Sequence, residues 1–145
     1  MREFRIGSFE YEMISDKGNR LINIHIPADA DMSIKCMKKS YEDAREFFET
    51  YIPEYAKADM VCCSWLLSPV LEKMLPSDSN IRNFRKSFDI VEVYNNSNEG
   101  IRWIYGREDL PIEELPEDTS LQKKMKKHLL DGNCTGSGYG ILNFF

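Results

Sequence analysis

The chain has 145 residues, with 42% hydrophobic and 30% charged side chains and a formal net charge of −5. These values are typical of one globular unit, and we expect residues 1–145 to form a single domain. The negative net charge argues against nucleic-acid binding as the main role, because nucleic-acid-binding proteins carry basic surfaces. No apolar run reaches the ~20 residues that span a bilayer, and no apolar leader opens the chain. We expect no membrane partner and a cytoplasmic location.

The first 27 residues predict a β-hairpin. Apolar residues alternate with polar ones in two stretches, which is the period of half-buried strands. The turn cluster Ser15–Asn19 separates the stretches, and Pro27 ends the second because it cannot donate to a strand ladder. The alternating residues are Phe9, Tyr11 and Met13, then Ile22, Ile24 and Ile26.

The clearest helix follows the hairpin. From Ile34 to Tyr51, apolar side chains recur at steps of three and four, and charged side chains occupy the opposite face. Ser33 is a suitable N-cap and Pro53 closes the run. The sequence therefore predicts a helix with one buried and one solvated face.

A central strand and a short helix come next. Met60–Leu67 is almost continuously apolar, as in a strand that is covered on both faces. Ser68 and Pro69 supply an N-cap and a first helical residue, so Val70–Leu75 predicts a short helix that Pro76 stops.

The rest of the chain predicts three more strands and one helix. Asn83–Tyr94 and Ile101–Tyr105 look like strands that are joined by a polar turn. Asp118–Ser120 caps a helix whose apolar stripe lies at positions 121, 125 and 129, and Gly132 follows as its C-cap. Residues 139–145 alternate again. The order ββ-α-β-α-β-β-α-β predicts an α+β fold, a mixed and mostly antiparallel sheet with helices packed on it.

Two clusters suggest phosphate binding, and each has a simpler interpretation. Lysines at 123, 124, 126 and 127 precede His128, and they suit either a phosphate-bearing ligand or the polar face of a helix. Glycines at 136, 138 and 140 form a GxGxG pattern, but no helix is predicted after it. We favour a solvated helix face and a flexible turn.

His25 and Cys63 are the candidate catalytic residues. His25 ends an apolar strand on the face opposite its isoleucines and is a possible general base, although a structural role is the alternative. Cys63 follows Cys62, and a thiol there needs an activating base or helix terminus to act as a nucleophile. Four cysteines without zinc-ligand spacing predict free, buried thiols and no bound metal.

A ligand site is also suggested near the end of the central strand. Ser64, Trp65 and Ser68 fall where α/β-type sheets place their ligands. Asn80 sits in a turn sequence shortly after, and Arg82 and Arg85, three apart, suit an anion. The alternative interpretation is that Asn80 stabilises a turn and that Arg82 and Arg85 are ordinary surface charges.

Five stretches occur in an order that resembles a known family, the GNAT-like C-terminal domain of a family of bacterial putative acyltransferases. The resemblance covers roughly residues 20–145. It implies a GNAT-type fold and transfer of an acyl group from acetyl-CoA or a longer acyl-CoA to a small amine. The stretches are Asn23–Pro27, Ala44–Phe48, Cys62–Leu67, Leu75–Ile81 and Asp118–Gln122.

Two departures from the family leave a second function open. The family has a histidine where this chain has Cys63, and the glycine-rich pyrophosphate loop of GNAT enzymes is absent. The enzyme reading places the thioester carbonyl against backbone N–H groups near Cys63–Trp65. The alternative is a non-catalytic domain that binds a small ligand or a partner.

The resemblance also bears on assembly, because the family domain usually follows an N-terminal acyltransferase domain. We expect either that missing partner domain or a symmetric homodimer to cover exposed aromatic residues at the chain ends; the alternative is that both ends pack on their own sheet. The candidates are Phe4, Phe9 and Tyr11, then Tyr139, Phe144 and Phe145.

Overall fold

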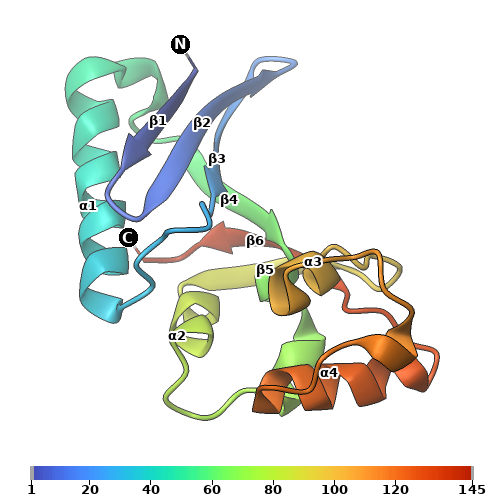
Figure 1. Cartoon of the computed structure of the whole chain (residues 1–145). Coiled ribbons are helices and arrows are strands. Elements are labelled where there is room, and N and C mark those ends of the chain that lie inside the picture. The colour runs from blue at the N-terminus through green and yellow to red at the C-terminus, as the bar shows by residue number, and fades with distance from the viewer. Residues whose placement is uncertain (1, 145) are drawn as a thin grey trace. The chain divides into compact units, whose positions relative to one another are not determined.

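A computed structural model describes residues 2–144. Its strands form one six-stranded sheet in the order β1-β2-β3-β4-β6-β5, and helices accompany the strands (Figure 1). The α+β class predicted from the sequence is confirmed. The described chain divides into two compact units, which are treated separately: residues 2–62, 83–89 and 140–144 form the first, and residues 63–82 and 90–139 the second.

The first unit opens with three antiparallel strands, β1 (Glu3–Ile6), β2 (Phe9–Asp16) and β3 (Asn19–His25). The β2–β3 hairpin is the one predicted, with Asp16 opposite Asn19 across the turn. Strand β1 was not predicted, because four residues are too few to show a period. Phe9, Tyr11 and Ile22 are completely buried, so one face of these strands belongs to the core.

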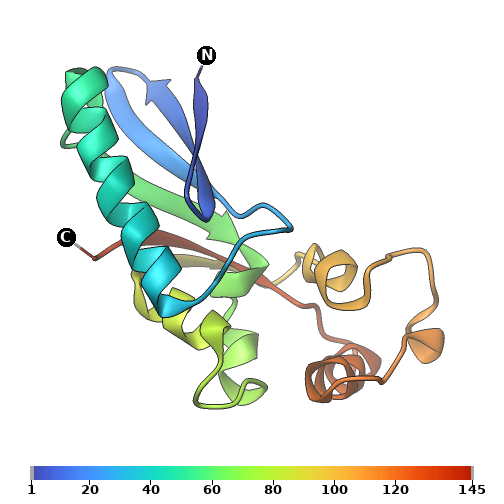
Figure 2. The same ribbon diagram turned by 60° about the vertical axis from the view of Figure 1, so that its left-hand side comes forward.

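Helix α1 (Ile34–Tyr51) covers that apolar face, as Figure 2 shows. It matches the predicted helix: the Ser33 hydroxyl accepts a hydrogen bond from the Cys36 N–H at 3.3 Å. The Tyr41 ring stacks on the Phe9 ring with centroids 5.6 Å apart. A 3-10 turn at Pro53–Tyr55 follows the helix.

Strand β4 (Asp59–Ser64) pairs in parallel with β3 and is shorter than predicted. The expected strand ran to Leu67, but Trp65–Leu67 forms a 3-10 turn. The Ser64 hydroxyl accepts the Leu66 N–H at 3.1 Å, so a side-chain cap replaces the strand ladder at that point. Ser68 then caps a second 3-10 helix, Pro69–Lys73, as predicted in outline.

The predicted strand Asn83–Tyr94 is wrong in its first half. Helix α2 (Asn80–Lys86) occupies that part, and β5 (Phe88–Tyr94) supplies the rest. The Ser79 hydroxyl accepts the Ile81 N–H at 3.1 Å and starts the helix. Seven residues give two turns, too few for a helical period to stand out from apolar alternation.

The predicted strand Ile101–Tyr105 is helix α3 (Gly100–Tyr105). Gly106 stops it in the left-handed conformation, with φ at 76°, and donates its N–H to the Arg102 carbonyl at 2.8 Å. Ile101, Trp103 and Tyr105 alternate in sequence, which imitates a strand.

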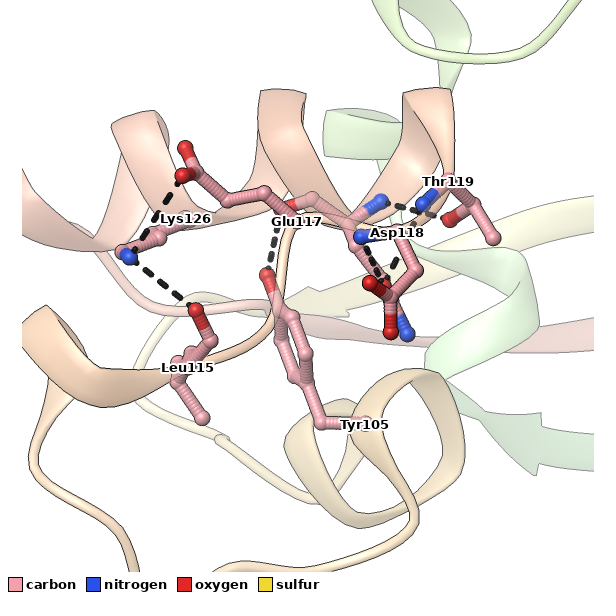
Figure 3. Close-up of polar contacts among 7 residues, drawn as sticks. Tyr105, Leu115, Glu117, Asp118, Thr119 and Lys126 are labelled. Carbon is pink, nitrogen blue, oxygen red and sulfur yellow. Dashed lines mark hydrogen bonds and ion pairs between the residues drawn. The ribbon is translucent and has the colours of Figure 1, made fainter.

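Helix α4 (Ser120–Leu130) begins at a capping box, shown in part in Figure 3. The Thr119 hydroxyl accepts the Gln122 N–H at 3.1 Å, and the Gln122 side chain accepts the Thr119 N–H in return. The Tyr105 hydroxyl donates to the Gln122 carbonyl at 2.7 Å, which ties α3 to α4. A 3-10 turn at Ile112–Glu114 precedes this helix, and β6 (Ser137–Leu142) follows it.

Of the chain-end aromatics expected to be exposed, Phe4, Phe9, Tyr11 and Phe144 are covered by their own unit, and Tyr139 is half-buried. Phe9 and Tyr11 are fully buried, and Phe4 packs on Phe47 at 4.8 Å. Phe144 lies 5.5 Å from the Tyr41 ring. Phe9 and Tyr11 are among the alternating residues of the predicted hairpin, and their side chains point to the buried face of the sheet. Phe145 lies outside the described residues. Among residues 2–144 no helix has the length and apolarity to cross a membrane.

Candidate functional site

The parallel ladder between β3 and β4 ends early. It joins Leu21 to Asp59 and runs to the pair Asn23 and Val61. Strand β3 continues to His25 beyond this last pair. Because the ladder stops while the strand goes on, Ile24 and His25 have no ladder partner on β4 among residues 2–144.

His25 lies at this ladder end, on the sheet face opposite α1. Side chains alternate along β3, so the buried Ile22 and Ile24 point to the helix and His25 points away from it. Its Nε2 lies 3.0 Å from Glu12 Oε1 and 3.3 Å from Asn23 Nδ2. The hydrogen bond from His25 lowers the pKa of the Glu12 carboxyl. The result is an exposed histidine–carboxylate pair at a ladder end.

More carboxyl groups share the same face. Glu3 stands opposite Glu12, and Glu10 stands opposite His25 in the register of the strands. A hydrogen bond with Glu10 raises the pKa of Glu3, with a smaller contribution from desolvation. Carboxylates this close repel one another and favour a nearby positive charge.

Cys63 does not have the surroundings of an activated nucleophile. It is exposed, whereas burial was expected, because it lies on the opposite face of β4 from Cys62. Desolvation, then the charges of Glu99 and Glu92, raise the pKa of its thiol. The predicted catalytic role for Cys63 therefore lacks the lowered pKa that such a role requires.

Ser64, Trp65 and Ser68 are brought into one buried part of the second unit. The Ser68 hydroxyl donates to the Thr135 carbonyl at 2.8 Å, and the Ser64 hydroxyl caps the turn after β4. A Cβ on Gly138 would stand 2.5 Å from the Leu67 carbonyl oxygen, so the backbones approach closely there. Glycine serves close packing at this point, and Gly138 and Gly140 of the GxGxG pattern lie within β6, not before a phosphate-binding helix.

Of the residues predicted to bind an anion, Asn80, Arg82 and Arg85, the guanidinium of Arg82 is engaged by the backbone of its own loop. The Arg82 guanidinium donates to the backbone carbonyls of Glu72 and Leu75 at 2.5 and 2.6 Å. It therefore closes the loop before α2. Asn80 is exposed at the start of that helix, whereas Arg85 is 7% exposed.

The start of α1 is poorly suited to a phosphate. Its cap is formed by Ser33, and Asp31 accepts the Ser33 N–H at 2.9 Å. Asp29 and Asp43 line the same hollow beside the first turns of the helix. Asp29 pairs there with Arg5 at 3.0 Å and Asp43 with Lys39 at 3.1 Å, so Asp31 is the carboxylate that opposes an anion where a free helix terminus would attract one.

Two lysines of the α4 cluster donate to backbone carbonyls. Lys126 donates to the Leu115 carbonyl at 3.0 Å, and Lys124 to the Met74 carbonyl at 3.4 Å. Among residues 2–144 no group of three His, Cys, Asp or Glu side chains is arranged to hold a metal ion. Sequence reasoning missed Glu12, because only the hairpin register brings it to His25.

The comparisons with known proteins give a consistent result. A sequence profile for the GNAT-like C-terminal domain matches residues 4–142. Similar folds occur in crystal structures of an acyltransferase with decanoyl-CoA (28% identity, TM-score 0.86) and with CoA and 10C-teicoplanin (23% identity, TM-score 0.87). These matches cover 97% and 99% of this chain, but 45% and 47% of those chains.

A third structure, of an acyltransferase with decanoyl-CoA and teicoplanin, has 24% identity and a TM-score of 0.85 over 97% of this chain and 46% of that chain. The chain thus spans less than half the length of the structures that it matches. Comparison with curated proteins finds no significant match. The profile match over nearly all of the sequence places the chain in the family of GNAT-like C-terminal domains.

Proposed function

We propose that the chain is a CoA-dependent acyltransferase domain that transfers an acyl group to an amine, with His25 as the general base. The observation that carries the proposal is the early end of the β3–β4 ladder with a histidine–carboxylate pair beside it. The family and the similar acyltransferase structures with decanoyl-CoA and CoA support this activity.

The ladder end suits the pantetheine arm of an acyl-CoA. That arm carries two amide groups, which can pair with strand backbone as another strand does. The backbone of Ile24 and His25 lies beyond the last ladder pair, so it is available on its β4 side. Amide pairing there would bring the thioester to the end of β3, near the imidazole.

The His25–Glu12 pair suits proton removal from the attacking amine. When Nε2–H donates to Glu12, the lone pair of the neutral imidazole stays on Nδ1. The amine nitrogen attacks the thioester carbonyl, the new C–N bond forms, and Nδ1 takes the proton. The C–S bond then breaks, and the leaving CoA thiolate takes from Nδ1 the proton that the imidazole had removed from the amine.

The acceptor is proposed to be a small amine. Glu3, Glu10 and Glu12 lie on the same face as His25, and their field attracts a protonated amine to that face. Of the other residues predicted from the sequence, Cys63 remains a proposed catalytic residue. Ser64, Trp65, Ser68, Asn80, Arg82 and Arg85 remain proposed contacts of the co-substrate.

The second candidate is a non-catalytic domain that binds a ligand or partner. It is favoured by the raised pKa of Cys63 and by the Asp31 carboxylate at the start of α1. A proposed partner, either a second copy or an N-terminal acyltransferase domain, would cover the edge strand β5. There Val91 and Val93 share one face and are 58% and 40% exposed.

Release of free CoA separates the two candidates. The chain is mixed with acetyl-CoA or decanoyl-CoA and a panel of primary amines, and the new thiol is measured over time. An acyltransferase releases CoA only when amine is present, and H25Q abolishes the release. A binding domain releases none, with any amine, while it still binds its ligand.

The proposed assembly has its own test. Sedimentation equilibrium at micromolar concentration is expected to give a dimer, and V91E/V93E is expected to give a monomer. A wild-type chain that stays at ~17 kDa well above that concentration contradicts the homodimer.

A further inference from the structure

A cavity of about 280 Å³ lies in the first unit between α1, the end of α2 and the residues after β6. Met37, Tyr41 and Phe144 supply its apolar walls, and Ser87 lies beside them. Ile34, Met37, Lys38 and Tyr41 of α1 fall at helical steps of three and four, so one stripe of the helix lines the cavity.

The Tyr41 hydroxyl is the unusual group in this cavity. Tyr41 has no exposed surface, yet among residues 2–144 its hydroxyl is the buried side-chain oxygen that lacks a hydrogen-bond partner. Desolvation raises the pKa of the phenol, and the Ser87 side chain, which lies outside full hydrogen-bonding geometry, lowers it in part through a weak hydrogen bond. A buried hydroxyl without a partner carries a desolvation cost that a ligand oxygen would remove.

Among the described residues that line the cavity, the charged side chains have one sign. Lys38 from α1 and Lys86 from α2 line it, and no aspartate or glutamate does. Within the described chain, neither lysine forms an ion pair or hydrogen bond. Two free ammonium groups beside apolar walls match a molecule that has an anionic end and an apolar body.

We propose that this cavity binds a small organic carboxylate, with its apolar body against Met37, Tyr41 and Phe144 and its carboxylate between Lys38 and Lys86. The volume is slightly below the range of ~300–1,000 Å³ that is usual for drug-sized ligands, so the ligand is small. Because the Tyr41 hydroxyl has no surface open to the cavity, it donates to the ligand only when the wall side chains shift as the ligand enters.

This site is separate from the one proposed for acyl transfer. Tyr41 packs on Phe9, whose side chain faces α1. His25 and Glu12 lie on the opposite face of the same strands. The two sites can therefore be tested independently.

Phenylacetate is a suitable probe, with phenylacetamide as its neutral counterpart. Titration is followed by the amide shifts of ¹⁵N-labelled full-length chain at 0.15 M salt. For a ligand of this size, we expect a dissociation constant on the order of 0.1–1 mM. The shifts are expected to be largest at residues 37–41 and 86–87, and phenylacetamide is expected to bind about tenfold more weakly.

Three variants test the individual groups. The double substitution K38Q/K86Q is expected to weaken phenylacetate binding about tenfold, and Y41F to weaken it several-fold. K35Q is the matched control, because Lys35 is an exposed lysine of the same helix that does not line the cavity. It should leave binding unchanged.

Three results would overturn the proposal. Equal binding of phenylacetate and phenylacetamide would show that the charge of the cavity is not used. K35Q removes one positive charge and K38Q/K86Q removes two, so a loss of binding free energy in K35Q half as large as in the double variant would reduce the effect to net charge. Displacement of phenylacetate by CoA would show that the cavity belongs to the acyl donor's site.

Discussion

The imidazole Nε2 of His25 lies 3.0 Å from Oε1 of Glu12 across the β2–β3 hairpin. The two residues are diagonal neighbours, because His25 stands opposite Glu10 while Glu12 stands opposite Asn23. Diagonal neighbours on one sheet face are within reach of long side chains. The lowered pKa of Glu12 keeps its carboxylate charged at neutral pH, where it can orient the imidazole.

Loss of the imidazole is therefore expected to abolish acyl transfer. H25Q should lower kcat by about 10²–10⁴, the range for removal of a general base. E12Q should lower it less, because the imidazole remains but loses its orienting partner. The initial rate of CoA release gives both values, and S15A, on the same hairpin but away from His25, serves as the control. A rate in H25Q equal to wild type contradicts the role of His25.

Two buried tyrosines are expected to respond differently to loss of the hydroxyl. The Tyr11 hydroxyl lies 2.8 Å from Ser40 Oγ, whereas that of Tyr41 has no partner among the described residues. Y11F should lower the free energy of unfolding by about 1 kcal/mol, and Y41F should leave it unchanged or raise it. Urea unfolding of both variants measures the difference. Equal losses would show that the Tyr41 hydroxyl is satisfied in solution.

The Cys63 thiol is expected to react slowly near neutral pH despite its exposure. Its raised pKa keeps the thiolate fraction small until the pH exceeds the ordinary value for cysteine. The midpoint of the pH–rate profile for alkylation should therefore lie above that of the same residue in urea. Removing charge in E92Q/E99Q should move the midpoint down. A midpoint below that of the unfolded chain would support a catalytic thiol.

The capping box of α4 is expected to stabilise the second unit. T119A removes the acceptor of the Gln122 N–H, which is 3.1 Å away, and should cost about 1 kcal/mol. S120A changes the next residue, which is exposed, and should be neutral or slightly stabilising. Thermal unfolding of the two variants makes the comparison. A T119A variant as stable as S120A would mean that water replaces the cap at no cost.

The elements that the sequence predicted correctly are those in which the apolar spacing repeats over many residues and a side-chain cap or a turn cluster marks the end. Helix α1 shows five turns of apolar spacing behind Ser33, and the hairpin shows alternation on both sides of a turn cluster. Helices α2 and α3 were read as strands because they span seven and six residues. The start of α2 depends on the hydrogen bond from the Ile81 N–H to the Ser79 hydroxyl, and the end of α3 depends on the left-handed Gly106.

The candidate site was predictable only in part for a related reason. His25 is visible in the sequence as a polar residue at the end of an apolar strand. Its partner Glu12 is 13 residues away, and only strand register brings the two together. The Arg82 guanidinium looked free to bind an anion, but its donors are used by backbone carbonyls seven and ten residues earlier.

The central claim is that this chain itself binds an acyl-CoA and uses it. Isothermal titration of the wild-type chain with acetyl-CoA and decanoyl-CoA, in the absence of amine, tests this most directly. The account predicts saturable heat with a dissociation constant below about 1 mM for at least one donor, and the same affinity in H25Q, whose imidazole acts on the amine. An absence of saturable heat with either donor at millimolar concentration would contradict the account.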